Sequence, residues 1–391
     1  MRPDTAPNLQ LELKSRLEQL LHTWTSVPAD SHEVLPGEEH IVAAMRDVVR
    51  PMVEALGPAE LRQHECGDLV ARFGPPGDDG LLLQTYIVSQ HGNLMDAPTA
   101  SVEEDGADHG LPGVVIRGQG ANQNKGPMAA AFTALDLLDQ DLRRPVWLAV
   151  NTEGRSSHGG SERIIDELGI RSSHAVIATA TDLAVSLGNR GRVDIHVTVP
   201  GRSAHSSQPS LGINPLPRAG AVIAALEDLE LPRPHAALGP AGVTPYQLTF
   251  HPVAPHTLPS EGRLIVDRRL LPGEDPATAT EQVRRHLQQR LAFEVQVEAG
   301  AVMLPAEVPA DAPVVVGLQK SAASIGVPVA TLHSRNTYDA GYGCSVGIPT
   351  VMFGPGRRSF GQQVLAAEVV SVEQCWQAAQ IYAGLASRLC T

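Results

Sequence analysis

A short segment of this 391-residue chain, NTEGRSSHGGS, brings three chemically different side chains together. Glu153 is a carboxylate that can move protons, and His158 can hold a substrate or a metal ion. Arg155 keeps its charge near neutral pH, so it repels cations and attracts carboxylate and amide oxygens. The segment therefore suggests acid–base chemistry on a molecule that carries such groups.

A metal site is the alternative for part of the same segment. His91, Asn93 and Asp96 lie together in the sequence SQHGNLMDAP. The first and last of them, together with Glu153 and His158, have the ligand types that suit zinc. Their spacing is not diagnostic, and such polar residues are often ordinary turn formers. A zinc site of these four residues stays open as an alternative.

The cysteines offer a third chemistry. The four of them lie far apart without a CxxC pair, which favours reduced thiols over a disulfide framework: Cys66, Cys344, Cys375 and Cys390. A cysteine beside a histidine can act as a nucleophile. No base is marked beside Cys344, so we expect a buried, inert thiol there.

The elements that must position these residues alternate along the first part of the chain. Helices are expected over 9–25, 38–56 and 127–138, and strands over 69–74, 81–89, 146–151 and 175–180. This alternation indicates an α/β domain with a largely parallel sheet.

The pattern changes at about residue 191. An alternating strand, RVDIHVTVPG, precedes a helix over 215–229 and three further strands, YQLTFHPV, GRLIVDRRL and FEVQVEAG. The helix–strand–helix pattern resumes from about 312 to the end. We therefore expect an α+β lid at 191–300, inserted into an α/β domain made of 1–190 and 301–391.

Composition narrows the class of protein. The chain has 43 acidic and 30 basic residues and a net charge of -13, which argues against nucleic-acid binding. It has no apolar run of about 18 residues that could span a membrane. The N-terminus lacks the apolar core of a signal peptide. We expect a cytoplasmic, soluble protein of two domains.

Several motifs follow one another along the chain. They are Gly118, Gly120, Ala121, Lys125 and Gly126 in one turn, NRG at 189–191, GRSAHSS at 201–207, LGINPL at 211–216, DRR at 267–269, YDA at 338–340 and GIPTVMFGPG at 347–356. In this order they resemble the M20 family of metallopeptidases and amidohydrolases, which includes carboxypeptidase G2-like, acetylornithine deacetylase-like and YgeY-like enzymes. The resemblance spans nearly the whole chain and implies a zinc-exopeptidase-like fold with a dimer-forming lid.

The resemblance breaks down at the metal ligands. The family binds two divalent cations, usually zinc, through two histidines and three carboxylates, and uses a further glutamate as general base. The matching positions here are Thr85, Gln123, Arg155, Thr179 and Gln363. In an ungapped alignment the catalytic pair falls on Gly154 and Arg155, and a shift of one residue retains only Glu153 as a base. Hydroxyl and amide side chains are poor zinc ligands, so we expect no metal cofactor.

The family's substrate-binding residues are mostly present. His205 resembles the lid histidine that reaches a partner subunit's site, although a surface histidine would look the same. Asn214 resembles the family's GxNA asparagine, and Arg269 the arginine that grips a substrate carboxylate. Either Arg268 or Arg269 must face solvent, because side chains alternate along a strand. The remaining candidates for substrate binding are Gln123, His158, Asn336, Tyr338 and Asp339.

Three functions fit these observations. The first is a metal-independent enzyme for C–N bonds, in which Arg155, Gln123 and His205 stabilise negative charge and Glu153 moves protons. The second is an inactive homologue that senses a ligand or partners an active paralogue. The third is a conventional dinuclear amidohydrolase with relocated ligands. A homodimer through the lid is implied by the resemblance.

Overall fold

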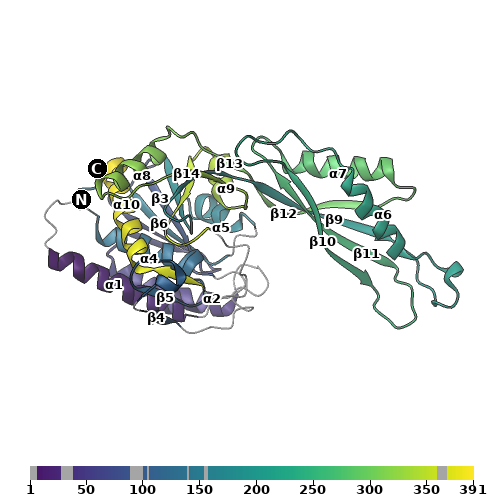
Figure 1. The fold of residues 1–391 in the computed structure, drawn as a ribbon, viewed down its shortest axis with the longest axis horizontal. Coiled ribbons are helices and arrows are strands. Elements are labelled where there is room, and N and C mark those ends of the chain that lie inside the picture. Colours follow the sequence, from purple (N-terminus) through teal and green to yellow (C-terminus); the bar gives the residue numbers. More distant parts are fainter. Residues whose placement is uncertain are drawn as a thin grey trace. The chain divides into compact units, whose positions relative to one another are not determined.

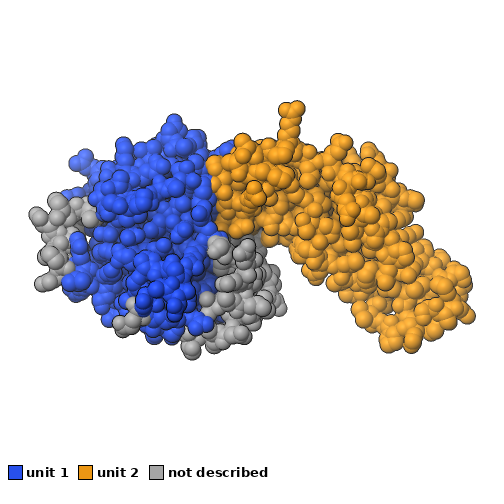
Figure 2. Space-filling model, in the orientation of Figure 1, with its two compact units in different colours: residues 1–188, 307–332, 342–391 blue, residues 189–306, 333–341 orange. Residues whose placement is uncertain are grey.

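The computed structural model describes residues 7–27, 38–88, 100–103, 105–138, 141–153, 157–358 and 368–391. The chain forms two compact units, which Figure 2 colours separately. Unit 1 consists of residues 1–188, 307–332 and 342–391, and unit 2 of residues 189–306 and 333–341. Residues 333–341 thus return to unit 2 after the chain has re-entered unit 1.

A mixed nine-stranded sheet forms the centre of unit 1 (Figure 1). Its order is β1 (Glu60–Gln63), β2 (Leu69–Phe73), β6 (Val146–Asn151), β3 (Leu81–Tyr86), β7 (His174–Ala178), β15 (Thr350–Phe353), β8 (Val185–Asn189) and β13 (Ala306–Glu307), with β14 (Thr331–Ser334) beside β8. The four central strands, from β6 to β15, are parallel. Their apolar runs are buried, as expected for parallel strands covered on both faces. The predicted α/β class is confirmed.

Helices cover this sheet because its side chains alternate between two buried faces. On one face, Leu82 and Trp147 pack with Ile164 of η5 (Arg163–Glu167), which continues α5 (Gly159–Glu162). Leu81 and Leu83 are buried on the other face. Two helices contact β3, namely α4 (Gly126–Asp136) and α10 (Val372–Cys390), and α1 (Pro7–Ser26) and α8 (Pro313–Ser324) pack against α10.

The chain also contains several short helices and a small three-stranded sheet outside the two main sheets and the helices that cover them. They are α2 (Glu39–Ala44), η1 (Met45–Val49) and α3 (Arg50–Ala55) in one helical stretch; the sheet of β4 (Ser101–Glu103), β5 (Val115–Arg117) and β16 (Val369–Ser371); η3 (Ala107–His109); η4 (Ala121–Lys125); η6 (Pro209–Leu211); and α9 (Ala340–Ser345). No helix within the described ranges is long and apolar enough to cross a bilayer.

Unit 2 is an antiparallel four-stranded sheet with two helices. The strand order is β10 (Gly242–His251), β11 (Glu261–Leu270), β9 (Gly191–Pro200) and β12 (Gln296–Met303). Alternate residues of the central strands, such as Val197 and Val266, are buried in one core with residues of α6 (Pro215–Glu227) and α7 (Pro276–Arg290). The other set of alternate residues therefore lies on the opposite face of the sheet.

Helix α7 was not predicted, because the sequence pattern indicates only one helix in this unit. The helix is strongly polar, and its buried apolar residues, Ala279, Val283 and Leu287, are spaced four apart. A stripe this narrow gives a weak periodic signal. The sequence nevertheless contains a signal for the start of this helix, an aspartate followed by a proline. In the structure Asp275 caps the helix by accepting a hydrogen bond from the Thr278 N–H.

Candidate functional site

The predicted residues of unit 1 gather at the carboxyl ends of its parallel strands. Tyr86 at the end of β3 lies opposite Asn151 at the end of β6, and the next N–H, that of Ile87, donates to the Asn151 carbonyl. Thr179 directly follows β7, the other neighbour of β3. Ligand sites of α/β proteins typically lie at this edge of the sheet.

The turn that contains Gln123 is fastened to the same edge. Thr179 donates through Oγ1 to the Gln123 carbonyl at 3.3 Å, and the Asn124 side chain donates to the Val88 carbonyl just beyond β3. Oε2 of Glu368 accepts the backbone N–H groups of Asn122 and Gln123, at 2.9 and 2.8 Å. These contacts hold the backbone of Gln123 near Thr179.

Glu153 is a buried carboxylate at this edge, with only 5% of its surface exposed. The Ser157 hydroxyl donates to its Oε1, and Nη2 of Arg163 donates to its Oε2 at 3.0 Å. A Cβ atom on Gly159 would lie 2.7 Å from Oε2, so only a glycine leaves this space. Both oxygens of Glu153 are thus engaged by the protein.

Arg163 also holds a second buried carboxylate. Its Nε donates to Oδ2 of Asp68 at 2.6 Å, while Oδ1 of Asp68 accepts the N–H and hydroxyl of Thr152 at 2.7 and 2.8 Å. Burial by itself would lower the pKa of Arg163, but the charges and hydrogen bonds of Asp68 and Glu153 outweigh it and raise that pKa. The guanidinium is therefore a fixed cation between two carboxylates.

Sequence reasoning missed both Asp68 and Arg163. The signal for Asp68 was a carboxylate directly before the apolar strand LVARF. The signal for Arg163 was a charge among buried residues of the stretch SERII, where an arginine needs partners. We expected Arg155 to supply the positive charge, but Arg155 lies outside the described residues.

A cysteine and a histidine lie beside this network. Nδ1 of His64 is 2.9 Å from Sγ of Cys66, and Nε2 is 3.1 Å from Glu167. Burial, with the nearby charge of Asp68, raises the pKa of Cys66 and so favours the neutral thiol. Burial also raises the pKa of Cys344, whose Sγ donates to the Thr350 carbonyl. The expectation of an inert thiol at Cys344 agrees with these contacts.

The described residues that we predict at the family's metal positions offer hydroxyl and amide groups, which are poor zinc ligands. The Thr85 hydroxyl donates to the Ala149 carbonyl, and the Thr179 hydroxyl donates to the backbone carbonyl of Gln123. No group of three or more His, Cys, Asp or Glu side chains within the described ranges is arranged to hold a metal ion. Gln363 and the alternative ligands His91, Asn93 and Asp96 lie outside those ranges. His158 precedes α5, and its ring lies 5.8 Å from the ring of Tyr342.

The candidates in unit 2 have local contacts of their own. His205 is exposed, and its Nδ1 lies 2.8 Å from the Ser207 hydroxyl. Asn214 caps α6 by accepting the Leu216 N–H at 3.1 Å. Arg269 pairs with Asp267 at 2.7 Å. Its neighbour Arg268 is fully buried, so the alternation places Arg269 on the face without helices, as expected.

The last three predicted ligands lie close together in the chain and differ in burial. Asn336 is exposed, Tyr338 is half-buried, and Asp339 is buried. A substrate-binding role for any of them stays a prediction.

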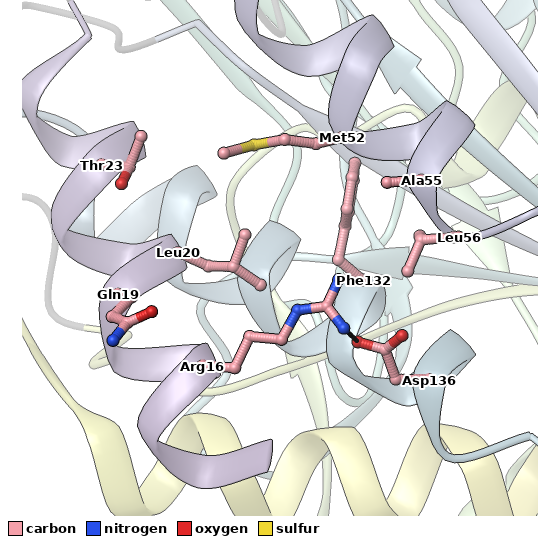
Figure 3. Close-up of a pocket in the computed structure, with 9 residues that line it drawn as sticks. All are labelled: Arg16, Gln19, Leu20, Thr23, Met52, Ala55, Leu56, Phe132 and Asp136. Carbon is pink, nitrogen blue, oxygen red and sulfur yellow. Dashed lines mark ion pairs between the residues drawn. The ribbon is translucent and has the colours of Figure 1, made fainter. Parts of the chain in front are cut away.

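A separate cavity of about 240 Å³ lies between α1, α3 and α4 (Figure 3). Leu20, Met52 and Phe132 line it, and an ion pair of 3.1 Å joins Arg16 to Asp136 at its side. None of the predicted site residues lines this cavity. It is therefore not the predicted site.

Comparison with known proteins places these features in a family. The chain is 26% identical to an acetylornithine deacetylase of Myxococcus xanthus over 70% of its own length and 72% of that protein. It is 29% identical to a succinyl-diaminopimelate desuccinylase of Acidiphilium cryptum, over 54% of each chain. Residues 187–294 match the M20 peptidase dimerisation domain. The chain is thus similar to M20 enzymes over most of its length, and residues 187–294 match the family's dimerisation domain.

The fold of the chain also matches a solved M20 structure. The M20 family metallo-carboxypeptidase Sso-CP2 of Sulfolobus solfataricus is similar with a TM-score of 0.71, at 17% identity, over 95% of this chain and 98% of that one. At this identity the likeness concerns the fold alone. The family recognition made from the motifs is confirmed.

Proposed function

We propose that this M20 protein binds a small molecule with carboxylate and amide groups and acts on its C–N bond without a metal ion. The names of the deacetylase and the desuccinylase describe removal of an acyl group. The observation that carries the metal-independent part is the replacement of the metal ligands. Thr85, Gln123 and Thr179 are neutral, and the nearby carboxylate of Glu153 is paired with Arg163.

In this proposal Glu153 moves the protons of the reaction. Its position after β6 puts a carboxylate at the sheet edge where ligands of α/β proteins bind. Gln123, Arg155 and His205 would stabilise the negative charge that develops on the carbonyl oxygen. Arg163 is a positioning residue, because it fixes Glu153 without being part of the predicted substrate contacts.

One observation favours a second function, that of a non-catalytic subunit. Both oxygens of Glu153 already accept hydrogen bonds within the protein, from Ser157 and Arg163, so the carboxylate is held in place by structural contacts. An inactive chain of this kind can still bind a ligand or complete the site of an active paralogue. Copurification with a metal-bearing paralogue would support this second function.

Self-association is also part of the proposal. The dimerisation-domain match covers most of unit 2, and β10 is an edge strand of its sheet with exposed Tyr246 and Leu248. An unpaired edge is a template for pairing with a second chain. Analytical ultracentrifugation should give a homodimer, and a monomer at all concentrations would remove this part of the proposal.

Metal content is the first test. The purified, untagged protein is analysed by mass spectrometry for metals, as isolated and after incubation with zinc, manganese or cobalt. We expect less than about a tenth of an equivalent in every case, because the ligand types are missing. One to two equivalents would overturn metal independence and direct attention to His91, Asp96, Glu153 and His158.

Activity is the second test. N-acetyl and N-succinyl amino acids are screened for hydrolysis with and without a chelator, using wild type, Glu153→Gln and the exposed Glu162→Gln as a matched control. Chelator-resistant activity whose kcat is strongly lowered by Glu153→Gln but not by Glu162→Gln, with KM little changed, supports catalysis. Retained ligand binding without any turnover would favour the non-catalytic subunit instead.

A further inference from the structure

Three side chains near the start of β2 form a row of contacts that we call the thiol triad. Its members are Cys66, His64 and Glu167. Sγ of Cys66 lies 2.9 Å from Nδ1 of His64, and Nε2 of the same ring lies 3.1 Å from Oε2 of Glu167. A nucleophile beside a base that a third group orients is the arrangement that activates a thiol or hydroxyl for covalent catalysis.

The hairpin turn between β1 and β2 holds the thiol and the ring in this position. The N–H of His64 donates to the Asp68 carbonyl at 2.8 Å, and the N–H of Gly67 donates to the His64 carbonyl at 2.9 Å. Gly67 has a φ of +99°, and a Cβ atom there would lie 3.0 Å from Cγ2 of Thr152. The hydroxyl of Thr152 donates to the Cys66 carbonyl at 3.1 Å. The turn is therefore tied to the end of β6, which limits the motion of its two reactive side chains.

The contacts of His64 fix its tautomer. The thiol and the backbone N–H of Cys66, the latter at 3.2 Å, both point at Nδ1. Nε2 faces the carboxylate of Glu167, which accepts hydrogen bonds and donates none when it is ionised. The neutral ring therefore carries its proton on Nε2 and presents a lone pair to the thiol. Glu167 then stabilises the imidazolium that forms when Nδ1 takes the thiol proton.

The thiol of Cys66 is neutral in the resting protein, and this decides the type of chemistry. Burial and the charge of Asp68, whose Oδ2 lies 3.6 Å from Sγ, raise the pKa of Cys66. The proton therefore leaves Sγ as the sulfur attacks, and the base that takes it stays next to the sulfur. From there it can return the proton to a leaving group. Acyl transfer benefits from this return, because an alkoxide or thiolate leaves more easily once it is protonated.

Access distinguishes Cys66 from the other cysteines. Cys66 is half-buried, and the side chain of His64 keeps 21% of its surface exposed, so a small reagent can reach them. Cys375 and Cys390 are buried. Sγ of Cys344 is engaged with a backbone carbonyl. Cys66 is therefore the cysteine best placed to react.

We propose that the thiol triad is a second reactive centre, at which Cys66 takes an acyl group from a small activated ester or thioester. Sγ attacks the carbonyl carbon and forms the new C–S bond, while Nδ1 of His64 takes the thiol proton. The C–O or C–S bond of the donor then breaks, and the proton passes from His64 to the departing oxygen or sulfur. The products are a thioester on Cys66 and a free alcohol or thiol, with no change in oxidation state. This centre does not involve Glu153 and goes beyond the proposed function.

Acylation and alkylation of the full-length protein test this inference. The acyl probe is p-nitrophenyl acetate and the alkylating probe is iodoacetamide, both at about pH 8, below the usual pKa of a thiol. Mass spectrometry of the intact protein and its peptides locates and times each modification. The variants are Cys66→Ala, His64→Gln, Glu167→Gln and Glu65→Gln. Glu65 is exposed in the same turn, so Glu65→Gln is the matched control that leaves the triad in place.

We expect Cys66 to carry the acetyl group in wild type and in Glu65→Gln, and Cys66→Ala to remain unmodified. His64→Gln should slow acylation by at least about tenfold, because a general base typically contributes about a hundredfold or more. Glu167→Gln should slow it about two- to fivefold, as the loss of an exposed ion pair predicts. The side chain of Glu167 is 56% exposed, so this variant is compatible with folding.

Three results would overturn the inference. They are acetylation of another cysteine ahead of Cys66, equal acylation rates in wild type and His64→Gln, and alkylation of Cys66 without any acetylation. Circular dichroism checks the folding of each variant. If His64→Gln does not fold, an unchanged rate in Glu167→Gln overturns the inference instead. Hydrolysis of N-acyl amino acids is measured separately, so its absence would contradict the proposed function and leave this result unaffected.

Discussion

Nη2 of Arg163 lies 3.0 Å from Oε2 of Glu153, and both side chains are almost inaccessible to solvent. The same guanidinium contacts Asp68, so one cation is shared by two buried carboxylates. A buried carboxylate without a partner would be costly, because burial penalises its charged form. The local charge balance at the end of β6 therefore comes from an amino-acid side chain.

The first prediction follows from this pairing. Arg163→Met should lower the free energy of unfolding by about 3 to 5 kcal/mol, because Asp68 and Glu153 both lose their buried partner. Urea denaturation followed by circular dichroism measures the change. Arg46→Gln, which removes the exposed pair with Asp47, should leave the midpoint unchanged. A loss below about 1 kcal/mol for Arg163→Met would contradict the assigned role.

The second prediction concerns the ion pair in the core of unit 2. Arg268 is fully buried, and its Nη2 lies 2.5 Å from Oε1 of Glu274. Glu274→Gln removes the counter-charge of a buried guanidinium and should cost about 3 kcal/mol in the free energy of unfolding. Glu281→Gln on the exposed face of α7 serves as the control in the same denaturation assay. Equal midpoints for the two variants would show that the pair contributes nothing.

The third prediction contrasts two glycines that become alanine. A Cβ atom on Gly341 would overlap the Leu304 carbonyl, whereas one on Gly220, inside α6, meets nothing within 4 Å. Gly341→Ala should therefore destabilise the protein by about 2 kcal/mol or more. Gly220→Ala should stabilise it by about 0.5 to 1 kcal/mol, because alanine loses less backbone entropy in a helix. Thermal unfolding of both variants checks the opposite signs.

The fourth prediction concerns pH. Burial raises the pKa of Asp194; Arg192 opposes this shift, and the charge of Asp267, its partner across β9 and β11, adds to it. A carboxyl whose pKa is raised by folding stabilises the protein at low pH, and this contribution is lost as the pH rises through the raised value. Asp194→Asn should therefore gain stability relative to wild type between about pH 4 and pH 7.

Urea midpoints of wild type and Asp194→Asn at several pH values measure this difference. The exposed Asp228→Asn is the control for the loss of one carboxylate. Histidine and other groups titrate in all three proteins, so their effects cancel in the comparison. A difference between wild type and Asp194→Asn that is constant with pH would contradict the prediction.

The sequence predicted the fold because its signals were local and strong. The apolar runs LLLQTY and VWLAVN became the parallel strands β3 and β6, and the motif order indicated the family. Helix α7 was not predicted, because a polar helix needs only a narrow apolar stripe when it packs on a sheet. Short strands such as β5 and β16 were not predicted, because three residues are too few to show the alternation of apolar and polar side chains.

The site was less predictable because its partners are distant in sequence. Asp68 and Arg163 are separated by 95 residues and meet only when β2 and η5 pack on the same sheet. Their residue types showed that charges would be buried, but not which charges would pair.

The chain passes between the two units at four places, and residues 333–341 belong to unit 2 although the segment before them belongs to unit 1. Unit 2 is therefore not a cassette that a single cut at each end can excise. A graft of residues 189–306 onto a related scaffold would leave His333 and Arg335 behind. Hybrids of this kind need the short return segment from the same donor as residues 189–306, and recombination breakpoints should be placed accordingly.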